Sequence, residues 1–377
     1  MWDEMVCTNT GELPQKRAGV SEIMGMGMRP PRIFAGLQAM RFLAAVMVVC
    51  THATFYVSTR LSNGFPVWDS GTQGVPLFFV ISGFVMTLST ASLPRGTLGA
   101  RKFVASRLIR IVPLYWALNL LKLAQILALP ALAFAKPDVW NVVLSMLFIP
   151  SRNAEGAVEA FYGVGWTLDF EMFFYAVLAI ALMFRRIPLY MFMAAVLIPA
   201  VLVAPYRQEH WPAVTFLLNP LLLDFLWGVA IGHLYLRGVR VSPHVSLVCL
   251  VVGLTIVFAL PKFPLLGLQY ALAIGGAVFL EEKWGQRVPR IAVIGGDASY
   301  SLYLVHPMVG VLVAVILHRA GISTPLAAIC AILVASTCAA YLTYVLFERP
   351  ITGMLRRRFT GGQLTPAALP AQSLTMH

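Results

Sequence analysis

A small set of ionisable side chains lies within otherwise apolar stretches of the sequence. Arg41 and His52 share the stretch QAMRFLAAVMVVCTH. On one α-helix this spacing turns through about 1,100°, so both side chains face the same side, roughly 16 Å apart along the axis. A histidine can take up or release a proton near neutral pH, as a general base must. The pair predicts a basic anchor and a catalytic base on one helix face. The alternative is a lipid-facing arginine with a histidine bonded to a neighbouring helix.

Two acidic residues occur in another apolar stretch, GWTLDFEMFFY, which begins beside Trp166. Asp169 and Glu171 are two positions apart, so they point in different directions on a helix. Counted from the start of its helix, Glu171 comes at nearly the depth of His52. A carboxylate beside an imidazole orients the ring and stabilises its protonated form. We therefore predict that Glu171 supports His52; a structural ion pair that closes the helix bundle is the alternative.

A basic pair, Arg107 and Arg110, lies on one face of the stretch RLIRIVPLYW. With Arg41 and Arg101–Lys102 these residues would form a cytoplasm-facing cationic cluster, and guanidinium groups suit the recognition of phosphate. Anchoring of helix ends to lipid phosphates explains the same residues equally well.

Other polar residues in apolar stretches are candidates for lining a cavity or joining neighbouring helices. Asp224 and His306, taken singly, are more typical of helix–helix contacts than of catalysis. Ser82 precedes Gly83 in FFVISGF, where a small residue permits close helix approach and a hydroxyl could line a cavity. The residues that we predict to support the site are Ser82, Trp166, Asp169, Tyr300 and His306.

The elements that must position these side chains are membrane helices. The chain has 377 residues, of which 59% are hydrophobic and 12% charged, against about 25% charged residues in a soluble domain. This composition excludes a nucleic-acid-binding protein, a disordered protein and a soluble enzyme with one compact core. We predict an all-α, polytopic membrane helical bundle. Five cysteines without a CxxC pair indicate neither a disulfide framework nor a metal site.

Apolar stretches of about 20 residues predict ten membrane spans. The predicted spans are 36–58, 74–92, 107–129, 165–184, 187–205, 214–237, 244–260, 263–281, 291–317 and 325–347. A shorter stretch at 139–150 is expected at the membrane interface. With the N-terminus inside, the cytoplasmic segments hold 20 Lys and Arg residues and the external loops hold 6, which follows the positive-inside rule.

This topology places both termini in the cytoplasm and makes the lipid bilayer the first partner, with anionic lipids facing the basic surface. We expect a cytoplasmic N-terminal tail at 1–33, the membrane domain at 34–350 and a cytoplasmic C-terminal tail at 351–377.

In chain order, these motifs resemble acyltransferase family 3, the multi-span bacterial membrane O-acyltransferases. The matching segments are Arg41-x10-His52, FFVISGF, Arg107-x-x-Arg110 with PLYW, GWTLDFEMFFY, ASYSLYLVHP and FERPI. The phrase WTLxxExFFY is similar to members that acetylate exopolysaccharides and other surface glycans. One position departs from the family pattern: Pro76 stands where many members have Asp, and Asp69 is the candidate to supply the missing carboxylate.

The resemblance implies transfer of an acetyl or other short acyl group from cytoplasmic acyl-CoA to a sugar hydroxyl. It implies that His52 and Glu171 are catalytic and that Arg41, Arg107 and Arg110 bind the acyl-CoA. Acetyl-CoA is then a donor substrate, and no permanently bound cofactor and no metal are expected. The implied setting is a bacterial inner membrane, with an exopolysaccharide or lipopolysaccharide acceptor and polysaccharide-assembly machinery as partners.

Two other functions are compatible with the same buried residues. A proton-coupled transporter or flippase for a glycan precursor would place Arg41, His52, Glu171 and Asp224 along a proton or substrate path. Its signature would be flux that depends on the proton gradient without consumption of acyl-CoA. A non-catalytic scaffold in a polysaccharide-assembly complex would keep its function when all these residues were mutated.

Overall fold

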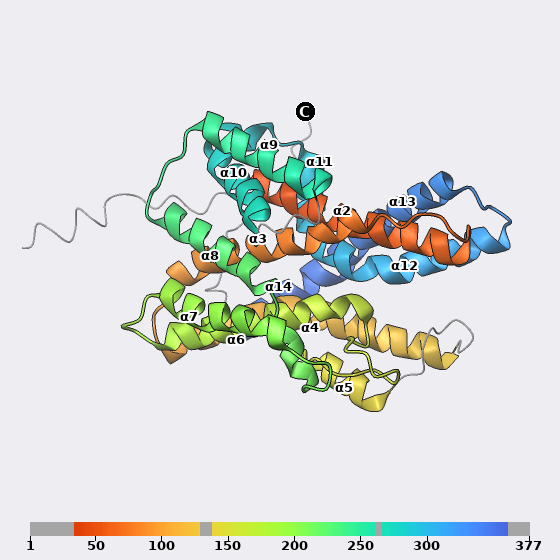
Figure 1. The fold of residues 1–377 in the computed structure, drawn as a ribbon, viewed down its shortest axis with the longest axis horizontal. Helices are drawn as coiled ribbons and strands as arrows, with labels where there is room; N and C mark the ends of the chain where they lie inside the picture. The colour runs from red at the N-terminus through yellow and green to blue at the C-terminus, as the bar shows by residue number, and fades with distance from the viewer. Residues whose placement is uncertain (1–33, 129–137, 261–265, 361–377) are drawn as a thin grey trace, which may run out of the picture. The chain divides into compact units, whose positions relative to one another are not determined.

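The computed structural model describes residues 34–128, 138–260 and 266–360, which form a bundle of helices (Figure 1). Within these ranges β-structure is limited to one isolated bridge, between Arg152 and Val158. The predicted all-α class is therefore confirmed. The N-terminal tail at 1–33 and residues 361–377 of the predicted C-terminal tail lie outside the described residues.

Seven helices carry or flank the residues singled out above. They are α2 (Ala35–Arg60), α3 (Gly74–Ala91), α4 (Thr97–Ala128), α6 (Trp166–Met183), α8 (Leu222–Leu236), α10 (Leu268–Trp284) and α12 (Ser299–Arg319). The other α-helices in the described ranges are α5 (Val139–Met146), α7 (Leu189–Val203), α9 (Pro243–Ala259), α11 (Arg290–Asp297), α13 (Pro325–Thr343) and α14 (Arg349–Thr360). Short 3₁₀ segments at Asp69–Gln73 and Gly163–Gly165 lead into α3 and α6.

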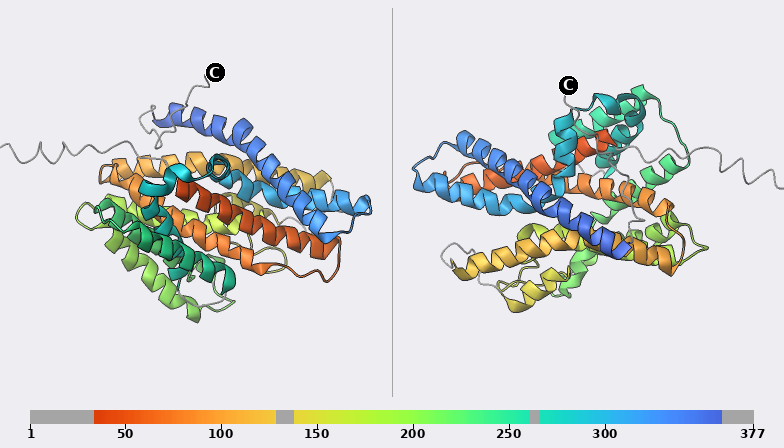
Figure 2. Two further views of the ribbon diagram at one scale, coloured as in Figure 1. Left: turned by 90° about the horizontal axis from the view of Figure 1, so that it is seen from above. Right: turned by 180° about the vertical axis from the view of Figure 1, so that it is seen from behind.

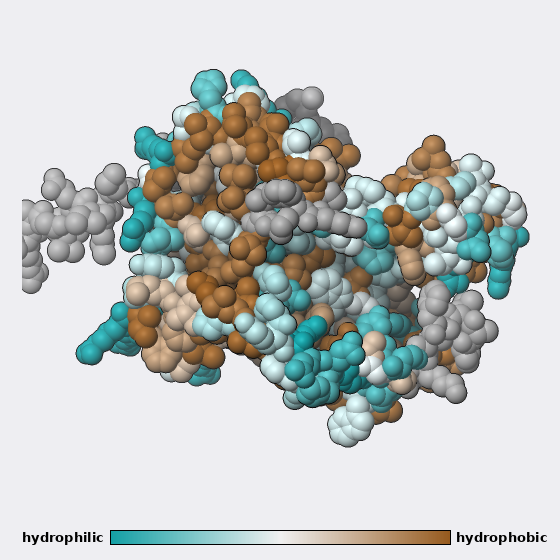
Figure 3. Space-filling view, in the orientation of Figure 1, coloured by the Kyte–Doolittle hydropathy of each residue, from teal (hydrophilic) through white to brown (hydrophobic). Residues whose placement is uncertain are grey.

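Seven helical segments of the described chain are long enough and apolar enough to cross a membrane. They are Ala35–Arg60, Asp69–Ala91, Thr97–Ala128, Gly163–Met183, Leu189–Tyr206, Ser299–Arg319 and Pro325–Phe359. The apolar helices α8 and α9 are shorter; the 15 residues of α8 span about 22 Å, less than the hydrocarbon core of about 30 Å. Figure 3 shows a broad apolar surface over α9 and α10. These features identify an integral membrane protein, and the number of ten spans stays a prediction.

Two predicted segments differ from the helices observed. The predicted span 291–317 is two helices, α11 and α12, that meet at Ala298. Gly296 lies so close to α2 that a Cβ atom would be 2.2 Å from the carbonyl oxygen of Gln38, so α11 packs on α2 as a separate short helix. The segment 351–360, predicted as tail, belongs to α14, which packs against α4.

Helix α2 carries both Arg41 and His52 and lies against α3, α11, α12 and α13 (Figures 1 and 2). Its first turn lacks a capping side chain from its own N-cap residue, Phe34. Glu281 of α10 fills that role, since its two carboxylate oxygens each accept a hydrogen bond of 2.7 Å, from the backbone N–H groups of Ala35 and Gly36. A carboxylate at a helix N-terminus also suits the helix dipole. The cap fixes the start of the helix from which both functional side chains project.

Helix α3 approaches α8 through glycines. A Cβ atom on Gly83 would lie 2.2 Å from the carbonyl oxygen of Phe225, and one on Gly228 would lie 2.1 Å from that of Val80. Backbones this close require residues without side chains. Ser82, next to Gly83, turns instead toward α6, where its hydroxyl donates to Glu171. The Ser82-Gly83 pair thus has both of the roles considered for it, close helix approach and a hydroxyl in a cavity.

Candidate active site

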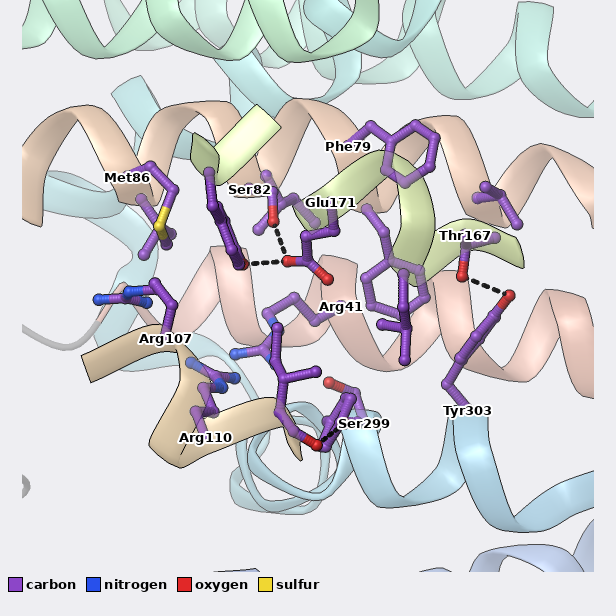
Figure 4. Close-up of a pocket in the computed structure, with 18 residues that line it drawn as sticks. Arg41, Phe79, Ser82, Met86, Arg107, Arg110, Thr167, Glu171, Ser299 and Tyr303 are labelled. Atoms are coloured by element: carbon purple, nitrogen blue, oxygen red, sulfur yellow. Dashed lines mark hydrogen bonds between the residues drawn. The ribbon is translucent and has the colours of Figure 1, made fainter. Parts of the chain in front are cut away.

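Three arginines converge on one pocket, which we call the arginine pocket (Figure 4). Arg41 comes from α2, and Arg107 and Arg110 come from adjacent turns of α4. The pocket encloses about 100 Å³, and its wall includes Ser82, Glu171 and apolar residues of α3 and α6. The fold therefore brings together Arg41, Arg107 and Arg110 of the expected cluster, whereas Arg101 and Lys102 are absent from the pocket wall.

The arginine pocket has more positive than negative charge in its wall. Glu171 is the carboxylate among its lining residues, and its Oε1 accepts hydrogen bonds from the hydroxyl of Ser82, at 2.7 Å, and from that of Tyr175. Nε of Arg107 is buried and lacks a hydrogen-bond partner in the described part of the chain. Arg41 makes one long bond, of 3.4 Å, to the side chain of Gln38. Guanidinium groups with unused donors in a confined site favour an anionic ligand.

Two further carboxylates lie behind the arginine pocket and join helices to one another. Glu348, in the FERPI motif, is buried and accepts a hydrogen bond of 2.6 Å from Ser301. Asp297, at the end of α11, accepts a bond of 2.9 Å from the side-chain amide of Gln38. Both carboxylates interact electrostatically with Arg41. Neither residue had a role predicted from the sequence, and Glu348 links the FERPI motif electrostatically to Arg41.

His52 lies in a second, larger space, which we call the histidine cavity. It encloses about 710 Å³ and includes Asp69, Pro76, Trp166 and Asp224 in its wall. Nδ1 of His52 is 3.0 Å from the carbonyl oxygen of Val48. Because a carbonyl oxygen only accepts hydrogen bonds, Nδ1 carries the proton of the neutral ring. Nε2 then has the free lone pair that a general base needs.

His306 is the immediate neighbour of His52, a relationship that the sequence did not reveal. The two rings meet edge to face with centroids 4.8 Å apart. His306 is 1% exposed, its Nδ1 is 3.1 Å from the carbonyl oxygen of Leu302, and its Nε2 has no partner among the described residues. Both neutral rings thus carry their proton on Nδ1, and His306 packs against the ring of His52, which lines the cavity.

The predicted pairing of Glu171 with His52 is wrong in this structure. Glu171 lines the arginine pocket and His52 lines the histidine cavity. The depth estimate assumed that α6 starts at the outer edge of the bundle. Most of the preceding segment 160–165 is instead buried, and the hydroxyl of Tyr162 donates to the carbonyl oxygen of Leu304 in α12. Helix α6 therefore starts inside the bundle, which brings Glu171 to the level of the arginines.

The predicted supporting residues separate into four groups. Ser82 and Tyr300 line the arginine pocket, and Trp166 lines the histidine cavity. His306 contacts the ring of His52. Asp169 is buried, is absent from the walls of both spaces and has an Oδ1 atom without a hydrogen-bond partner among the described residues.

Tyr303 and Val75 belong to the walls of both spaces. The hydroxyl of Tyr303 is held by two bonds, accepting from Thr167 at 3.0 Å and donating to the carbonyl oxygen of Val164 at 3.2 Å. This tyrosine therefore forms a fixed partition between the arginine pocket and the histidine cavity. Tyr303 was not among the residues predicted from the sequence, although its place three residues before His306 puts both on one helix face.

Comparison with known proteins agrees with the motifs. The family model described as "Acyltransferase domain" matches residues 34–345. The exopolysaccharide production protein ExoZ of Rhizobium meliloti (strain 1021) is 31% identical over 328 residues, which cover 83% of this chain and 99% of that protein. No solved structure matches the chain.

The match to an acyltransferase family favours an enzyme over the transporter and the scaffold considered above. It spans the residues that form both the arginine pocket and the histidine cavity. The chain therefore belongs to acyltransferase family 3 and is a membrane O-acyltransferase.

Proposed function

We propose that this protein transfers a short acyl group, such as acetyl, from acyl-CoA to a hydroxyl group of an exopolysaccharide or of its lipid-linked precursor. The observation that carries the proposal is the junction of two chemically different spaces at Val75 and Tyr303. One space is cationic and the other contains an imidazole. The ExoZ relative is named for exopolysaccharide production, which supports an exopolysaccharide as the acceptor.

The arginine pocket is the proposed site for the donor. Arg41, Arg107 and Arg110 would bind the phosphate groups of acyl-CoA through charge-assisted hydrogen bonds. The pantetheine arm would then extend toward Tyr303 and bring the thioester to the partition.

His52 is the proposed general base. Its Nε2 would take the proton from the acceptor hydroxyl while that oxygen attacks the thioester carbonyl and forms the ester bond. The carbon–sulfur bond breaks, and the leaving thiolate of CoA takes up the proton from the imidazolium. Because Glu171 lies beside the arginines, its proposed role is structural. It would hold the wall of the arginine pocket together by accepting hydrogen bonds from Ser82 and Tyr175. Asp69 shares the cavity with His52 and Pro76, which supports it as the carboxylate that replaces the one missing from the family pattern.

We further propose that the donor enters from the cytoplasm and the acceptor from the opposite side of a bacterial inner membrane. The charge asymmetry supports ten spans with both termini in the cytoplasm. Arg41 lies near the start of α2, and His52 follows eleven residues later, about 16 Å farther along the helix. In this orientation, polysaccharide-assembly machinery would present the acceptor to the histidine cavity.

The direct test combines a cellular and a biochemical measurement. Deletion of the gene is expected to remove O-acetyl groups from surface glycans, as measured by NMR of the purified polysaccharide. Complementation with His52→Ala is expected to fail, and complementation with His244→Ala, at an exposed histidine of α9, is expected to succeed. Membranes that contain His52→Ala should still bind acetyl-CoA. Normal acetylation by His52→Ala would overturn the mechanism.

A further inference from the structure

The wall of the histidine cavity has the opposite polarity to that of the arginine pocket. Its lining contains no Lys or Arg among the described residues, but it does contain two carboxylates and three side-chain amides. These groups are Asp69, Asp224, Gln73, Asn219 and Gln269. Carboxylate and amide groups thus offer hydrogen bonds to a ligand with several hydroxyl groups, and the part of the wall that the structure describes has no cation to attract an anionic ligand.

Two of these groups are buried and have unused acceptor atoms. Asp224 is 4% exposed, and no donor in the described part of the chain is bonded to its carboxylate. Gln269 is 5% exposed, and its Oε1 has no partner among the same residues. Buried acceptors left without a donor are costly, and in a cavity a water molecule or a ligand can supply that donor. Hydroxyl groups of a ligand in the cavity would supply the missing donors.

A glycine keeps the Asp224 carboxylate accessible. Gly267 precedes α10 with a φ of 86°, and a Cβ atom there would lie 2.3 Å from Oδ1 of Asp224. The neighbouring Leu266 is fixed by its carbonyl oxygen, which accepts a bond of 2.8 Å from the indole N–H of Trp227. The loop into α10 therefore leaves open the space beside the carboxylate.

Aromatic rings complete the wall. Trp166, Tyr270, Tyr303 and Phe55 line the same cavity, whose volume of about 710 Å³ lies within the range of about 300–1,000 Å³ typical of ligand sites. Sugar rings have apolar C–H faces, which pack on aromatic side chains, and equatorial hydroxyls, which donate to carboxylates and amides. A pyranose therefore matches both components of this wall.

We propose that the histidine cavity binds a neutral pyranose unit of the acceptor, with Asp224 and Gln269 accepting its hydroxyl hydrogens. The exposed carboxylate of Asp69, in the same wall, selects against acidic sugars, such as uronates, and against phosphorylated ones. The proposal names the acceptor class for the transfer proposed above and rests on that function for its biological meaning. Binding of the sugar itself requires no acyl donor.

The test measures sugar binding without acyl-CoA, by saturation-transfer difference NMR on the full-length protein in lipid nanodiscs. The probes are cellobiose, which is neutral, and cellobiouronic acid, which carries one carboxylate. Wild-type protein should bind cellobiose about tenfold more tightly than the acid. Asp69→Asn, which removes the charge and keeps the shape, should reduce this preference at least several-fold, and Gln269→Ala should weaken cellobiose binding. Glu209→Gln, at an exposed carboxylate outside the cavity, should match wild type.

Three results would overturn the proposal: no binding of cellobiose by wild type, equal binding of the two sugars, or unchanged selectivity in folded Asp69→Asn protein. Because Asp69 is exposed, this substitution should leave the fold intact. Transfer from acetyl-CoA is assayed separately. Selective sugar binding without acetyl transfer would refute the proposed function but support the sugar site. Acetyl transfer without selective sugar binding would support the proposed function but refute the sugar site.

Discussion

The arginine pocket and the histidine cavity differ in charge, in volume and in the helices that build them. Three guanidinium groups surround about 100 Å³ in the first, whereas carboxylates, amides and an imidazole surround about 710 Å³ in the second. Helix α4 contributes to the first space, and α8 and α10 contribute to the second. Helices α2, α3, α6 and α12 contribute to both. A shared set of helices thus holds two sites of opposite polarity in contact.

This contrast indicates how one bundle can bring together two substrates of unlike chemistry. An anionic donor is stabilised only where cations are in excess, and a polyhydroxy acceptor is stabilised where hydrogen-bond acceptors are in excess. Separation by Tyr303 keeps each substrate in its own electrostatic environment. Changes to one space should therefore leave binding to the other unaffected, and this independence can be tested.

The largest effect is expected from loss of the base in the histidine cavity. His52→Ala should lower the rate of acetyl transfer about 10²- to 10⁴-fold, the contribution typical of general acid–base catalysis. Isothermal titration calorimetry with acetyl-CoA should give an unchanged Kd, because the arginines are intact. A loss of acetyl-CoA binding in the folded variant would show that the two spaces are not independent.

The next effect concerns the arginine pocket. Arg41→Gln removes one of three cations and should raise the Kd for acetyl-CoA about 10- to 100-fold, as expected for loss of a charge-assisted contact. Cellobiose binding should stay at the wild-type value. Arg240→Gln, at an exposed arginine, is the matched control for loss of charge. An equal effect of the two substitutions would contradict a specific donor site.

A smaller and more selective effect is expected at the partition. Tyr303→Ala should open the wall between the two spaces and shift the preference between acetyl-CoA and butyryl-CoA about tenfold toward the longer donor. Tyr303→Phe removes the bonds to Thr167 and Val164 but keeps the ring, so its donor preference should stay near wild type. The ratio of kcat/KM values for the two donors is the measurement. A ratio unchanged by the alanine would show that the partition does not set acyl length.

The smallest effect is expected at the cap that positions α2. Glu281→Gln should lower the free energy of unfolding by about 0.5–2 kcal/mol, because the amide replaces a charged acceptor at two backbone N–H groups. Acetyl-CoA and cellobiose binding should fall together, since α2 carries both Arg41 and His52. Thermal unfolding in detergent measures the first effect, and Glu282→Gln, an exposed neighbour, is the control. Loss of only one binding activity would contradict a shared scaffold.

Sequence predictions about residues on one helix were more accurate than those that depended on the relative heights of two helices. The position of Arg41 relative to His52, and the convergence of Arg107 and Arg110, follow from helix geometry within one or two helices, and the structure agrees. The pairing of Glu171 with His52 required the relative heights of two helices. That prediction failed because segment 160–165 turns into the bundle before α6 begins.

The functional residues that the sequence did not indicate were missed for one physical reason. Tyr303 and Gln269 are ordinary polar residues in apolar helices, and their roles arise from neighbours that are distant in sequence, such as Thr167 and Asp224. The contact between the His52 and His306 rings joins residues 254 positions apart. Periodicity describes which face of a helix a residue occupies but does not say which helix that face meets.

By itself, the sequence determined that this protein is a helical membrane bundle, that basic residues gather at one level of its early helices and that its motifs are those of acyltransferase family 3. These properties depend on composition, on local helical periodicity and on motif order, all of which a linear chain contains. The tertiary structure alone decided that the ionisable residues divide between two spaces, that Glu171 belongs with the arginines and that Tyr303 separates the two. Those outcomes depend on helix heights and close glycine contacts, which are set only when the whole bundle packs.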